Sequence, residues 1–418
     1  MTELRRSDRA TYTPALQPDY AATVACDPSK IRDGNIPAGL ALSDFNFLNP
    51  GTALLTHPFA LYSAGHDPEN PPPAIIRDRD RTTSTLVGDS GGYQIKKGTL
   101  TWREDRTRQA ILEFLETYAD YSMTLDHPPH AAKDGKPDRA EFQNCLDKTN
   151  VNLKFFDRVR QGKTKWINVI QGRDMKEIAA WIDCVKWFDS AGWAVGGGFT
   201  LNPANLLELL IYLRDRNLLD RREIFHQFGK GSIALACFYT DVQQAMRQAG
   251  IDIAITFDTS TPFRMTGEHK NQFTNPAFTT RRFGMSAGKL FDDRSYVGSP
   301  VPFPFTSAVG SRIKLGDICV RDEKFQDTCW DALSHVMIKH HNLDAYLRGL
   351  DMAHNISALA DCDAQKHSPR WLMFARDAAR RVFKASDPMT VIKHLKRDLR
   401  KEGIDQMISE DEGKEVSV

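Results

Sequence analysis

Short apolar segments alternate with longer amphipathic segments along most of this chain, and the alternation limits the folds open to it. Six apolar segments predict strands, at 85–88, 121–125, 166–170, 193–196, 224–228 and 253–257. Helical patterns lie between them, near 104–119, 148–161, 174–189, 202–217 and 239–249. Alternation at this spacing favours parallel βαβ units. With one further strand expected before these six and one after, the pattern predicts an α/β fold, a (β/α)8 TIM barrel of about 250 residues; a doubly wound open sheet is the alternative.

The composition is typical of a globular protein, with 41% hydrophobic and 26% charged residues in 418. No apolar run approaches the ~20 residues of a membrane span, and residues 1–6 lack the apolar region of a secretory signal, so we expect no membrane partner. Seven scattered cysteines argue against a disulfide framework and favour a reducing cytoplasm, in a bacterial cell or a phage-infected host. The net charge of +1 neither requires nor excludes a nucleic acid partner.

Changes in composition divide the chain into four parts. Residues 1–40 are polar and turn-rich and predict a peripheral arm, and 41–316 hold the predicted barrel. Residues 317–365 introduce three cysteines and several histidines, and 366–418 predict a helical, basic segment that ends in a solvated tail. The stretch 262–287 has no clear period and predicts a long functional loop after a strand.

Each predicted strand ends in a polar residue or a glycine. These positions are Asp89, Asp126, Gln171-Gly172, Gly196-Gly197-Gly198, Gly229-Lys230-Gly231 and Asp258. In a barrel they would all project from the face formed by the carboxyl ends of the strands, where barrel active sites are built. Glycine and aspartate also punctuate ordinary strand-to-helix turns, which explains any one position better than it explains all of them together.

The residue types at these strand ends suit chemistry on a glycosidic bond. Asp258 could attack an anomeric carbon and hold a covalent glycosyl intermediate, and Asp89 could act as general acid and base. Two carboxylates of this kind also fit a retaining glycosidase, which is the alternative from the residues alone.

The remaining strand-end residues suit recognition of a flat heterocycle. Asp126 and Gln171 could read its hydrogen-bonding edge, because a carboxylate accepts from N–H groups and an amide both donates and accepts. The backbone at Gly196 could touch the same ring, and Tyr93 and Phe228 could stack on its two faces.

Taken in order, these motifs resemble the tRNA-guanine transglycosylase superfamily over residues 80 to 360. The matching segments are Asp89-Ser90-Gly91-Gly92-Tyr93-Gln94, Leu125-Asp126, Ile170-Gln171-Gly172, Val195-Gly196-Gly197, Phe228-Gly229-Lys230-Gly231 and Phe257-Asp258. The resemblance implies a TIM-barrel pentosyltransferase that exchanges guanine for a 7-deazaguanine through a covalent intermediate. It implies Asp258 as nucleophile and Asp89 as general acid and base. The base would be bound by Ser90, Tyr93, Asp126, Gln171, Gly196, Gly197 and Phe228.

The same resemblance implies a structural zinc ion in a subdomain after the barrel. Cys329 and His354 match the last cysteine and the histidine of the family's zinc site, while its Cys-x-Cys is absent here. Cys319 is the nearest substitute, and His335 and Cys362 are further candidate ligands. The alternative is that the cysteines pack as small apolar side chains.

Departures from the common pattern favour DNA over tRNA as the substrate. The nucleophile is followed by Thr259-Ser260-Thr261-Pro262-Phe263-Arg264, and Asp126 by His127-Pro128-Pro129. These runs resemble the divergent branch that inserts 7-deazaguanines such as preQ0 into bacterial or phage DNA and protects it from nucleases. Exchange on tRNA, in queuosine or archaeosine synthesis, is the alternative; a non-catalytic binding barrel and simple base hydrolysis also stay open.

A target base must be flipped out of a duplex, or be single-stranded, to reach such a site. Basic side chains would hold the phosphate backbone. The candidates near the motifs are Lys96, Lys97, Arg264, Arg281 and Arg282. A C-terminal cluster, Arg376, Arg380, Arg381, Lys384, Lys393, Lys396 and Arg397, is either a second contact or a solvated helix face. The resemblance also suggests a homodimer.

Overall fold

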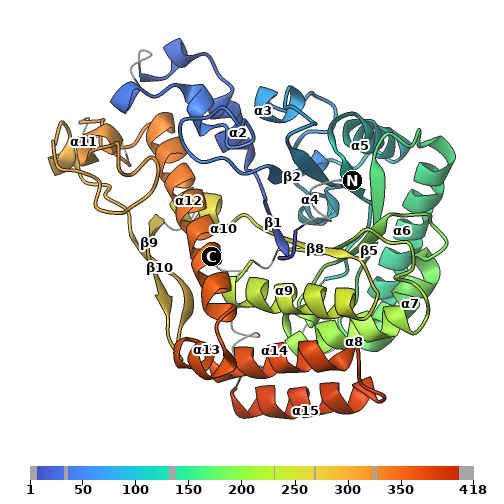
Figure 1. Cartoon of the computed structure of the whole chain (residues 1–418). Coiled ribbons are helices and arrows are strands. Elements are labelled where there is room, and N and C mark those ends of the chain that lie inside the picture. Colours follow the sequence, from blue (N-terminus) through green and yellow to red (C-terminus); the bar gives the residue numbers. More distant parts are fainter. Residues whose placement is uncertain are drawn as a thin grey trace.

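The computed structural model describes residues 7–32, 36–130, 138–229, 231–267, 270–322 and 327–403. Within them, eight parallel strands form one sheet in the order β1-β8-β7-β6-β5-β4-β3-β2 (Figure 1). Their bounds are β1 Thr11–Pro14, β2 Phe59–Ser63, β3 Thr85–Asp89, β4 Tyr121–Met123, β5 Lys165–Ile170, β6 Gly192–Val195, β7 Ile224–Gln227 and β8 Ala254–Thr259. The two edge strands approach each other, because Ala15 pairs with Leu61 and the Leu16 N–H donates to the Leu61 carbonyl at 2.9 Å. The sheet therefore forms a nearly closed barrel, consistent with the predicted (β/α)8 architecture.

All six predicted strands are present, but the two remaining strands both precede them. The expectation of one strand before and one after was wrong, because β1 and β2 both come earlier in the chain. Strand β1 lies inside the segment 1–40 that was expected to be a peripheral arm. Its sequence, Thr-Tyr-Thr-Pro, has no apolar run, and so it carries none of the signal by which buried parallel strands are found.

Helices follow the strands and cover the outside of the barrel (Figure 1). The longer ones are α5 Asp105–Tyr118, α6 Arg139–Val159, α7 Met175–Val185, α8 Pro203–Arg214, α9 Ile233–Gln248, α12 Ala332–Ser357, α14 Arg370–Val382 and α15 Pro388–Lys401. The shorter ones are α2 Pro18–Val24, α3 Ala74–Arg77, α4 Gly92–Lys97, α10 Thr261–Gly267, α11 Leu315–Ile318 and α13 Asp361–His367. The 3-10 turns are η1 Pro28–Lys30, η3 Pro37–Gly39, η4 Leu42–Phe45, η5 Ala64–His66, η6 Phe199–Leu201 and η7 Arg294–Tyr296.

The stretch 262–287, expected to be a long loop, is mostly regular structure. It holds most of helix α10 and of an antiparallel hairpin made of β9, Asn271–Phe278, and β10, Phe283–Lys289. The hairpin packs on α12, with the Phe273 N–H bonded to the Asn342 side chain at 2.8 Å. Many residues of these two strands are only partly buried, so the sequence showed no clear alternation of apolar and polar residues.

Apolar side chains fill the barrel interior below the strand ends. The cluster comprises Leu61, Val87, Tyr121, Met123, Ile167, Val169, Ala194, Ile224 and Ala254. Because side chains alternate along a strand, the inward positions that follow these residues lie one layer higher, at the carboxyl ends. The interior is thus a packed core that supports whatever those ends carry.

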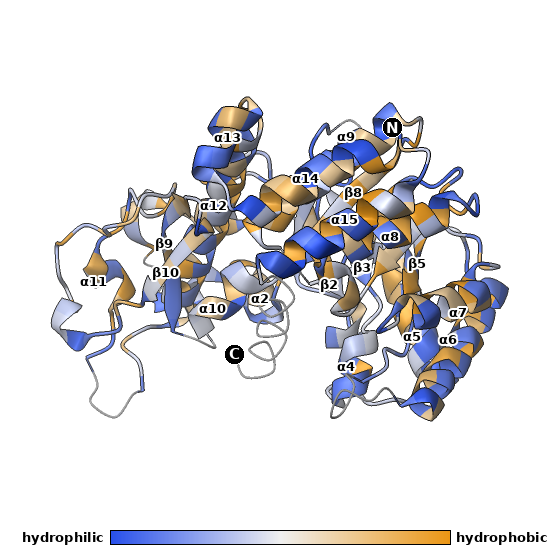
Figure 2. Ribbon diagram, turned by 90° about the horizontal axis from the view of Figure 1, so that it is seen from below, coloured by the Kyte–Doolittle hydropathy of each residue, from blue (hydrophilic) through white to orange (hydrophobic). Residues whose placement is uncertain are grey.

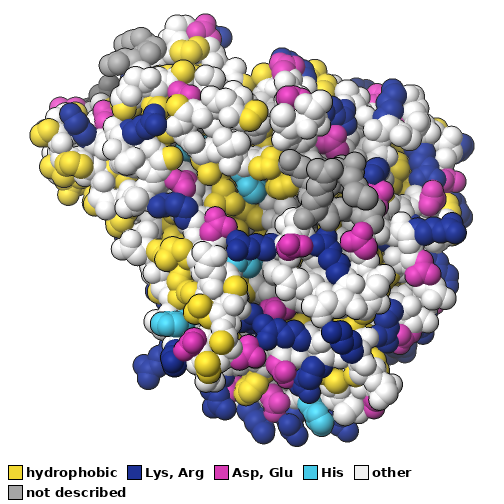
Figure 3. Space-filling model, viewed as in Figure 1, with side chains coloured by type: hydrophobic (Ala, Val, Ile, Leu, Met, Phe, Trp, Pro, Cys, Tyr) yellow, Lys and Arg dark blue, Asp and Glu magenta, His cyan; other side chains and the backbone are white. Residues whose placement is uncertain are grey.

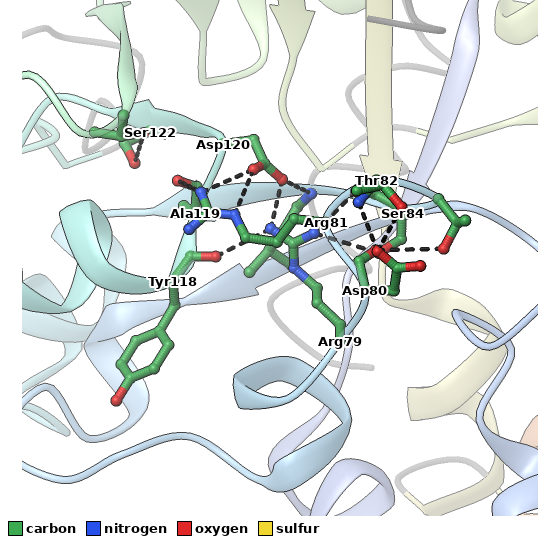
Figure 4. Close-up of polar contacts among 12 residues, drawn as sticks. Arg79, Asp80, Arg81, Thr82, Ser84, Tyr118, Ala119, Asp120 and Ser122 are labelled. Atoms are coloured by element: carbon green, nitrogen blue, oxygen red, sulfur yellow. Dashed lines mark hydrogen bonds and ion pairs between the residues drawn. The ribbon is translucent and has the colours of Figure 1, made fainter.

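A buried ion-pair cluster secures the opposite end of the barrel (Figure 4). The Arg79 guanidinium, almost fully buried, donates to the Asp120 carboxylate and to the Tyr118 carbonyl. Asp120 also accepts from Arg81 at 2.8 Å and from the backbone N–H of Leu86 at 2.8 Å. These residues lie shortly before β3 and β4 or near the first residues of those strands. The cluster therefore stabilises the start of the two strands. It lies away from the carboxyl ends of the strands.

The C-terminal helices pack on the outer side of the barrel helices. Helix α14 packs against α9, and α15 packs against α14 and α8 (Figure 2). Ile392, Leu395 and Leu399 are buried on the inner face of α15. Among the described residues, no helix combines the length and apolar character needed to cross a membrane.

Candidate functional site

Asp258 lies near the carboxyl end of β8 and is 6% exposed. Its Oδ1 accepts two hydrogen bonds, one from the Gly229 N–H at 2.7 Å and one from the His226 Nε2 at 3.2 Å. Within the described parts of the chain, no group donates to Oδ2. The carboxylate is therefore held through one oxygen.

Asp89 lies at the end of β3, beside Ser63 at the end of β2. The Ser63 hydroxyl donates to Asp89 Oδ2 at 2.6 Å and accepts from the Gly65 N–H at 3.1 Å. Burial raises the pKa of Asp89, while hydrogen bonds from Ser63 and Gly91 oppose the rise. The negative charge of Asp258 adds a smaller rise to the pKa of Asp89. A carboxyl with a raised pKa is suited to give and take a proton.

Asp126 and Gln171 form a pair just beyond β4 and β5. The Gln171 Nε2 donates to Asp126 Oδ2 at 2.8 Å, and both side chains are buried. Burial raises the pKa of Asp126 to about 7, with the charge of Asp89 adding to the rise and the Gln171 hydrogen bond opposing it. The pair offers oxygen acceptors and an amide at one place, as recognition of a heterocycle edge requires.

Two glycines allow the chain to pass close to this pair. A Cβ on Gly92 would lie 2.6 Å from the Asp126 carbonyl oxygen, and one on Gly196 would lie 2.9 Å from the Gln171 Nε2. Gly197 has φ +80°, a conformation that favours glycine. Glycine at these positions is thus required by close approach or by backbone conformation.

Ser90 and the two aromatic side chains are less clearly directed at a ligand. The Ser90 hydroxyl is fully buried and donates to the Thr124 carbonyl at 3.1 Å, so it holds the end of β4. Tyr93 is 60% exposed on α4, and Phe228 packs edge-on against the His226 ring, with centroids 5.0 Å apart. The proposed stacking of a base between Tyr93 and Phe228 stays a prediction.

The basic residues expected to contact a phosphate backbone fall into two groups. Lys96 and Lys97 lie on α4 and Arg264 lies on α10, the helices that directly follow β3 and β8. Lys96 donates to the Pro129 carbonyl at 2.6 Å, and the Lys97 ammonium lies 5.5 Å from the centroid of the Tyr93 ring. The second group, Arg281 and Arg282, lies at the exposed turn of the hairpin β9–β10.

The C-terminal basic cluster is largely engaged in ion pairs. Arg376 and Arg380 both contact Asp241, and Lys396 contacts Glu208. Figure 3 shows Lys and Arg side chains over α14 and α15 with acidic side chains between them. These contacts attach the two helices to α8 and α9, as packing requires.

The residues expected to bind zinc are not brought together. The Cys319 thiol donates to the Phe291 carbonyl at 2.7 Å and the Cys329 thiol to Asp292 Oδ1 at 3.1 Å, in one neighbourhood. Burial and the adjacent Asp292 raise the pKa of Cys329. His354 lies near the far end of α12, roughly 33 Å along the helix axis from its start, and its Nε2 contacts Thr240 Oγ1 at 3.0 Å.

The donor set of Cys319, Cys329 and His354 therefore does not fit a single zinc ion. Of the two other candidates, His335 packs edge-on against Trp330 and Cys362 is exposed on α13. Within the described ranges, no three His, Cys, Asp or Glu side chains are grouped so that they could hold a metal ion.

Sequence reasoning missed His226 and Ser63, which contact the two principal carboxylates. His226 lies in a run of buried residues, where a single histidine is hard to tell from a packed one. One indication in the sequence that His226 faces the site is its place two residues before the predicted site residue Phe228, because alternate residues of a strand face the same side. Ser63 ends a strand that was not predicted.

Comparison with known protein families finds no match for this chain, and a comparison with curated proteins finds none either.

Proposed function

We propose that this chain is a base-exchange transglycosylase that replaces guanine in DNA with a 7-deazaguanine of the preQ0 type. The observation that carries the proposal is the set of side chains at the carboxyl ends of parallel strands. There a carboxylate held through one oxygen, Asp258, accompanies a carboxyl of raised pKa, Asp89, and the acceptor pair Asp126 and Gln171. Such a set supports displacement at a sugar carbon next to a recognised base better than it supports sugar binding alone.

The reaction would proceed in two displacements. The target nucleotide is flipped out, and Asp258 Oδ2 attacks C1′ while the C1′–N9 bond to guanine breaks. Asp89 in its protonated form, which burial favours, gives its proton to the departing guanine. The incoming base then loses its N9 proton to the Asp89 carboxylate, N9 attacks C1′, and the bond from C1′ to Asp258 breaks.

Recognition of both bases would fall to the buried pair. Guanine and a 7-deazaguanine present N–H donors on the same edge, and Asp126 accepts from such donors. The Gln171 amide both orients Asp126, through its 2.8 Å hydrogen bond, and leaves its own oxygen for the base. Lys96, Lys97 and Arg264, on the helices that follow β3 and β8, would lie nearest the phosphates.

Release of labelled guanine tests the proposal. Guanine-labelled single-stranded DNA, duplex DNA and unmodified tRNA are incubated with the full chain, with and without preQ0. We expect release from DNA that depends on the acceptor base, and a protein–DNA adduct that survives denaturation. Asp258→Asn should reduce both by about 10⁴-fold or more, because the amide cannot act as the nucleophile.

The other possible outcomes of this assay distinguish between substrates, between exchange and hydrolysis, and between roles of Asp258. Release from tRNA alone would replace DNA by tRNA as the substrate, and release without acceptor would indicate base hydrolysis. Full exchange by Asp258→Asn would refute its role as nucleophile. Asp387→Asn, a change at the exposed N-cap of α15, is the matched control and should behave as wild type.

A further inference from the structure

His226 is the histidine that faces the candidate nucleophile from inside the barrel. It lies on β7, is fully buried, and uses both ring nitrogens. Its Nδ1 is 2.8 Å from Thr256 Oγ1, and its Nε2 is 3.2 Å from Asp258 Oδ1. Thr256 is the residue of β8 that pairs with His226 in the sheet register, and Asp258 comes two residues later on the same side of β8. The three side chains thus form a chain of contacts between neighbouring strands.

The chemistry of the three side chains determines which of them donates and which accepts in each hydrogen bond. An ionised carboxylate only accepts hydrogen bonds, so the proton between His226 and Asp258 must be on Nε2. In the neutral ring Nδ1 then accepts, and the buried Thr256 hydroxyl donates to it. The Thr256 hydroxyl is therefore compatible with the tautomer in which His226 donates to Asp258, and it holds the other side of the ring.

We propose that His226 is a positioning residue that orients Asp258, so that the lone pairs of Oδ2 point at the reacting carbon. Oδ1 accepts from a rigid ring on one strand and from the Gly229 N–H, and these two donors define the plane of the carboxylate. Rotation that brought Oδ1 into the reaction would leave a buried imidazole N–H without a partner, which is costly. The assignment rests on the proposed function, because it gives Asp258 the role of nucleophile.

Several other groups surround the carboxylate without replacing this contact. Burial raises the pKa of Tyr12, Tyr239 and Tyr346, and the nearby charge of Asp258 adds a smaller rise. The Tyr12 and Tyr346 hydroxyls are bonded to the carbonyls of Thr259 and Gly231. His226 is thus the side-chain donor to Asp258 among the residues that the structure describes.

Three variants test the inference in the exchange assay. His226→Leu removes the donor and keeps a side chain that suits the barrel interior. We expect kcat and the single-turnover rate of adduct formation to fall by about 10–100-fold, with KM for DNA and for the acceptor base within about twofold. His226→Gln places an amide N–H near the position of Nε2 and should restore the rate to within about threefold of wild type. Thr256→Val should give an intermediate loss.

A matched control is available at His341. This histidine is also fully buried and also uses both ring nitrogens, on Ser307 Oγ and on the Phe273 carbonyl, but it lies on α12, away from the strand ends. His341→Leu should lower the melting temperature and leave the rate of adduct formation in the folded fraction unchanged. A wild-type rate in His226→Leu, or equal losses in its Leu and Gln variants, would overturn the positioning role.

A failure of the proposed function gives a different result from a failure of the positioning role of His226. Wild-type protein that forms no adduct and exchanges no base would overturn both ideas at once. A third measurement does not depend on activity: the ¹⁵N shifts of the His226 ring in histidine-labelled protein. We expect a proton on Nε2, as a donor to Asp258 requires, whereas a ring protonated on Nδ1 alone would overturn the inference.

Discussion

The three carboxylates at the strand ends have similar burial but different partners. Asp258 accepts two hydrogen bonds on one oxygen, Asp89 accepts from Ser63, and Asp126 accepts from a neutral amide. A neutral amide offsets burial less than a charged donor does, and burial raises the pKa of Asp126 to about 7. Differences in partners, more than differences in burial, therefore separate the roles that these carboxyl groups can take.

The raised pKa of Asp126 predicts how stability depends on pH. A carboxyl whose pKa is higher in the folded state contributes its full stabilisation below the pKa of the unfolded chain, about 4, and loses it as the pH rises through about 7. Asp126→Asn keeps the oxygen that accepts from Gln171 but never ionises. Relative to wild type, its free energy of unfolding should therefore increase by about 2 kcal/mol between pH 5 and pH 8.

Urea unfolding of both proteins at these two pH values measures this difference. Because the comparison is between variant and wild type at each pH, the titration of groups that do not interact with Asp126 cancels. An advantage for Asp126→Asn that does not change between pH 5 and pH 8 would show that Asp126 ionises normally in the fold.

Helix α12 keeps two of the expected zinc ligands apart. The spacing of Cys329 and His354 resembles that of a family in which both bind one ion, but Cys329 precedes the unbroken helix α12, and His354 lies near the far end of that helix. Sequence spacing gives the number of residues between two ligands and not the path of the chain between them. A continuous helix extends about 1.5 Å per residue, so spacing alone could not predict the separation.

This geometry predicts that His354 has no part in metal binding. His354→Gln should leave the zinc content per chain equal to that of wild type, measured by atomic emission on purified protein. Loss of the contact between His354 and Thr240 should cost about 1 kcal/mol of unfolding free energy. Cys329→Ser is the comparison variant, since any zinc in this region would depend on that thiol. A fall in zinc content in His354→Gln would contradict the arrangement of α12.

The sequence predicted those strands of the barrel whose two faces are both buried. Strands such as β5 and β8 are nearly continuous apolar runs, because their outer faces lie under helices and their inner faces in the core. Their polar ends predicted Asp89, Asp126, Gln171 and Asp258 as site residues, although their roles stay predictions. The inward hydroxyl of Ser63 and the ring of His226 could not be predicted, because their importance comes from neighbours on adjacent strands.

Strand β1 is held in place by closure of the barrel, although its own sequence has no strand pattern. It pairs with β8 along its whole length and meets β2 at Ala15, so it lies between β8 and β2 in the barrel. Thr13 is fully buried, and its hydroxyl donates to the Phe257 carbonyl at 3.1 Å. A peripheral arm could detach while the barrel stayed intact, whereas this strand should open only when the barrel unfolds.

Amide hydrogen exchange distinguishes these two possibilities. The Leu16 N–H, bonded to the Leu61 carbonyl at 2.9 Å, and the Ala15 N–H, bonded to the Thr259 carbonyl at 3.3 Å, should exchange as slowly as the amides of β8. Peptides that cover 11–16 and 254–259, followed by mass spectrometry at increasing urea, should converge on one free energy of opening. The two-stranded hairpin β9–β10 is the internal comparison and should exchange at a lower free energy, because one face of it is partly exposed. Fast exchange in 11–16 beside slow exchange in 254–259 would mean that β1 detaches by itself, and that the first forty residues behave as an arm after all.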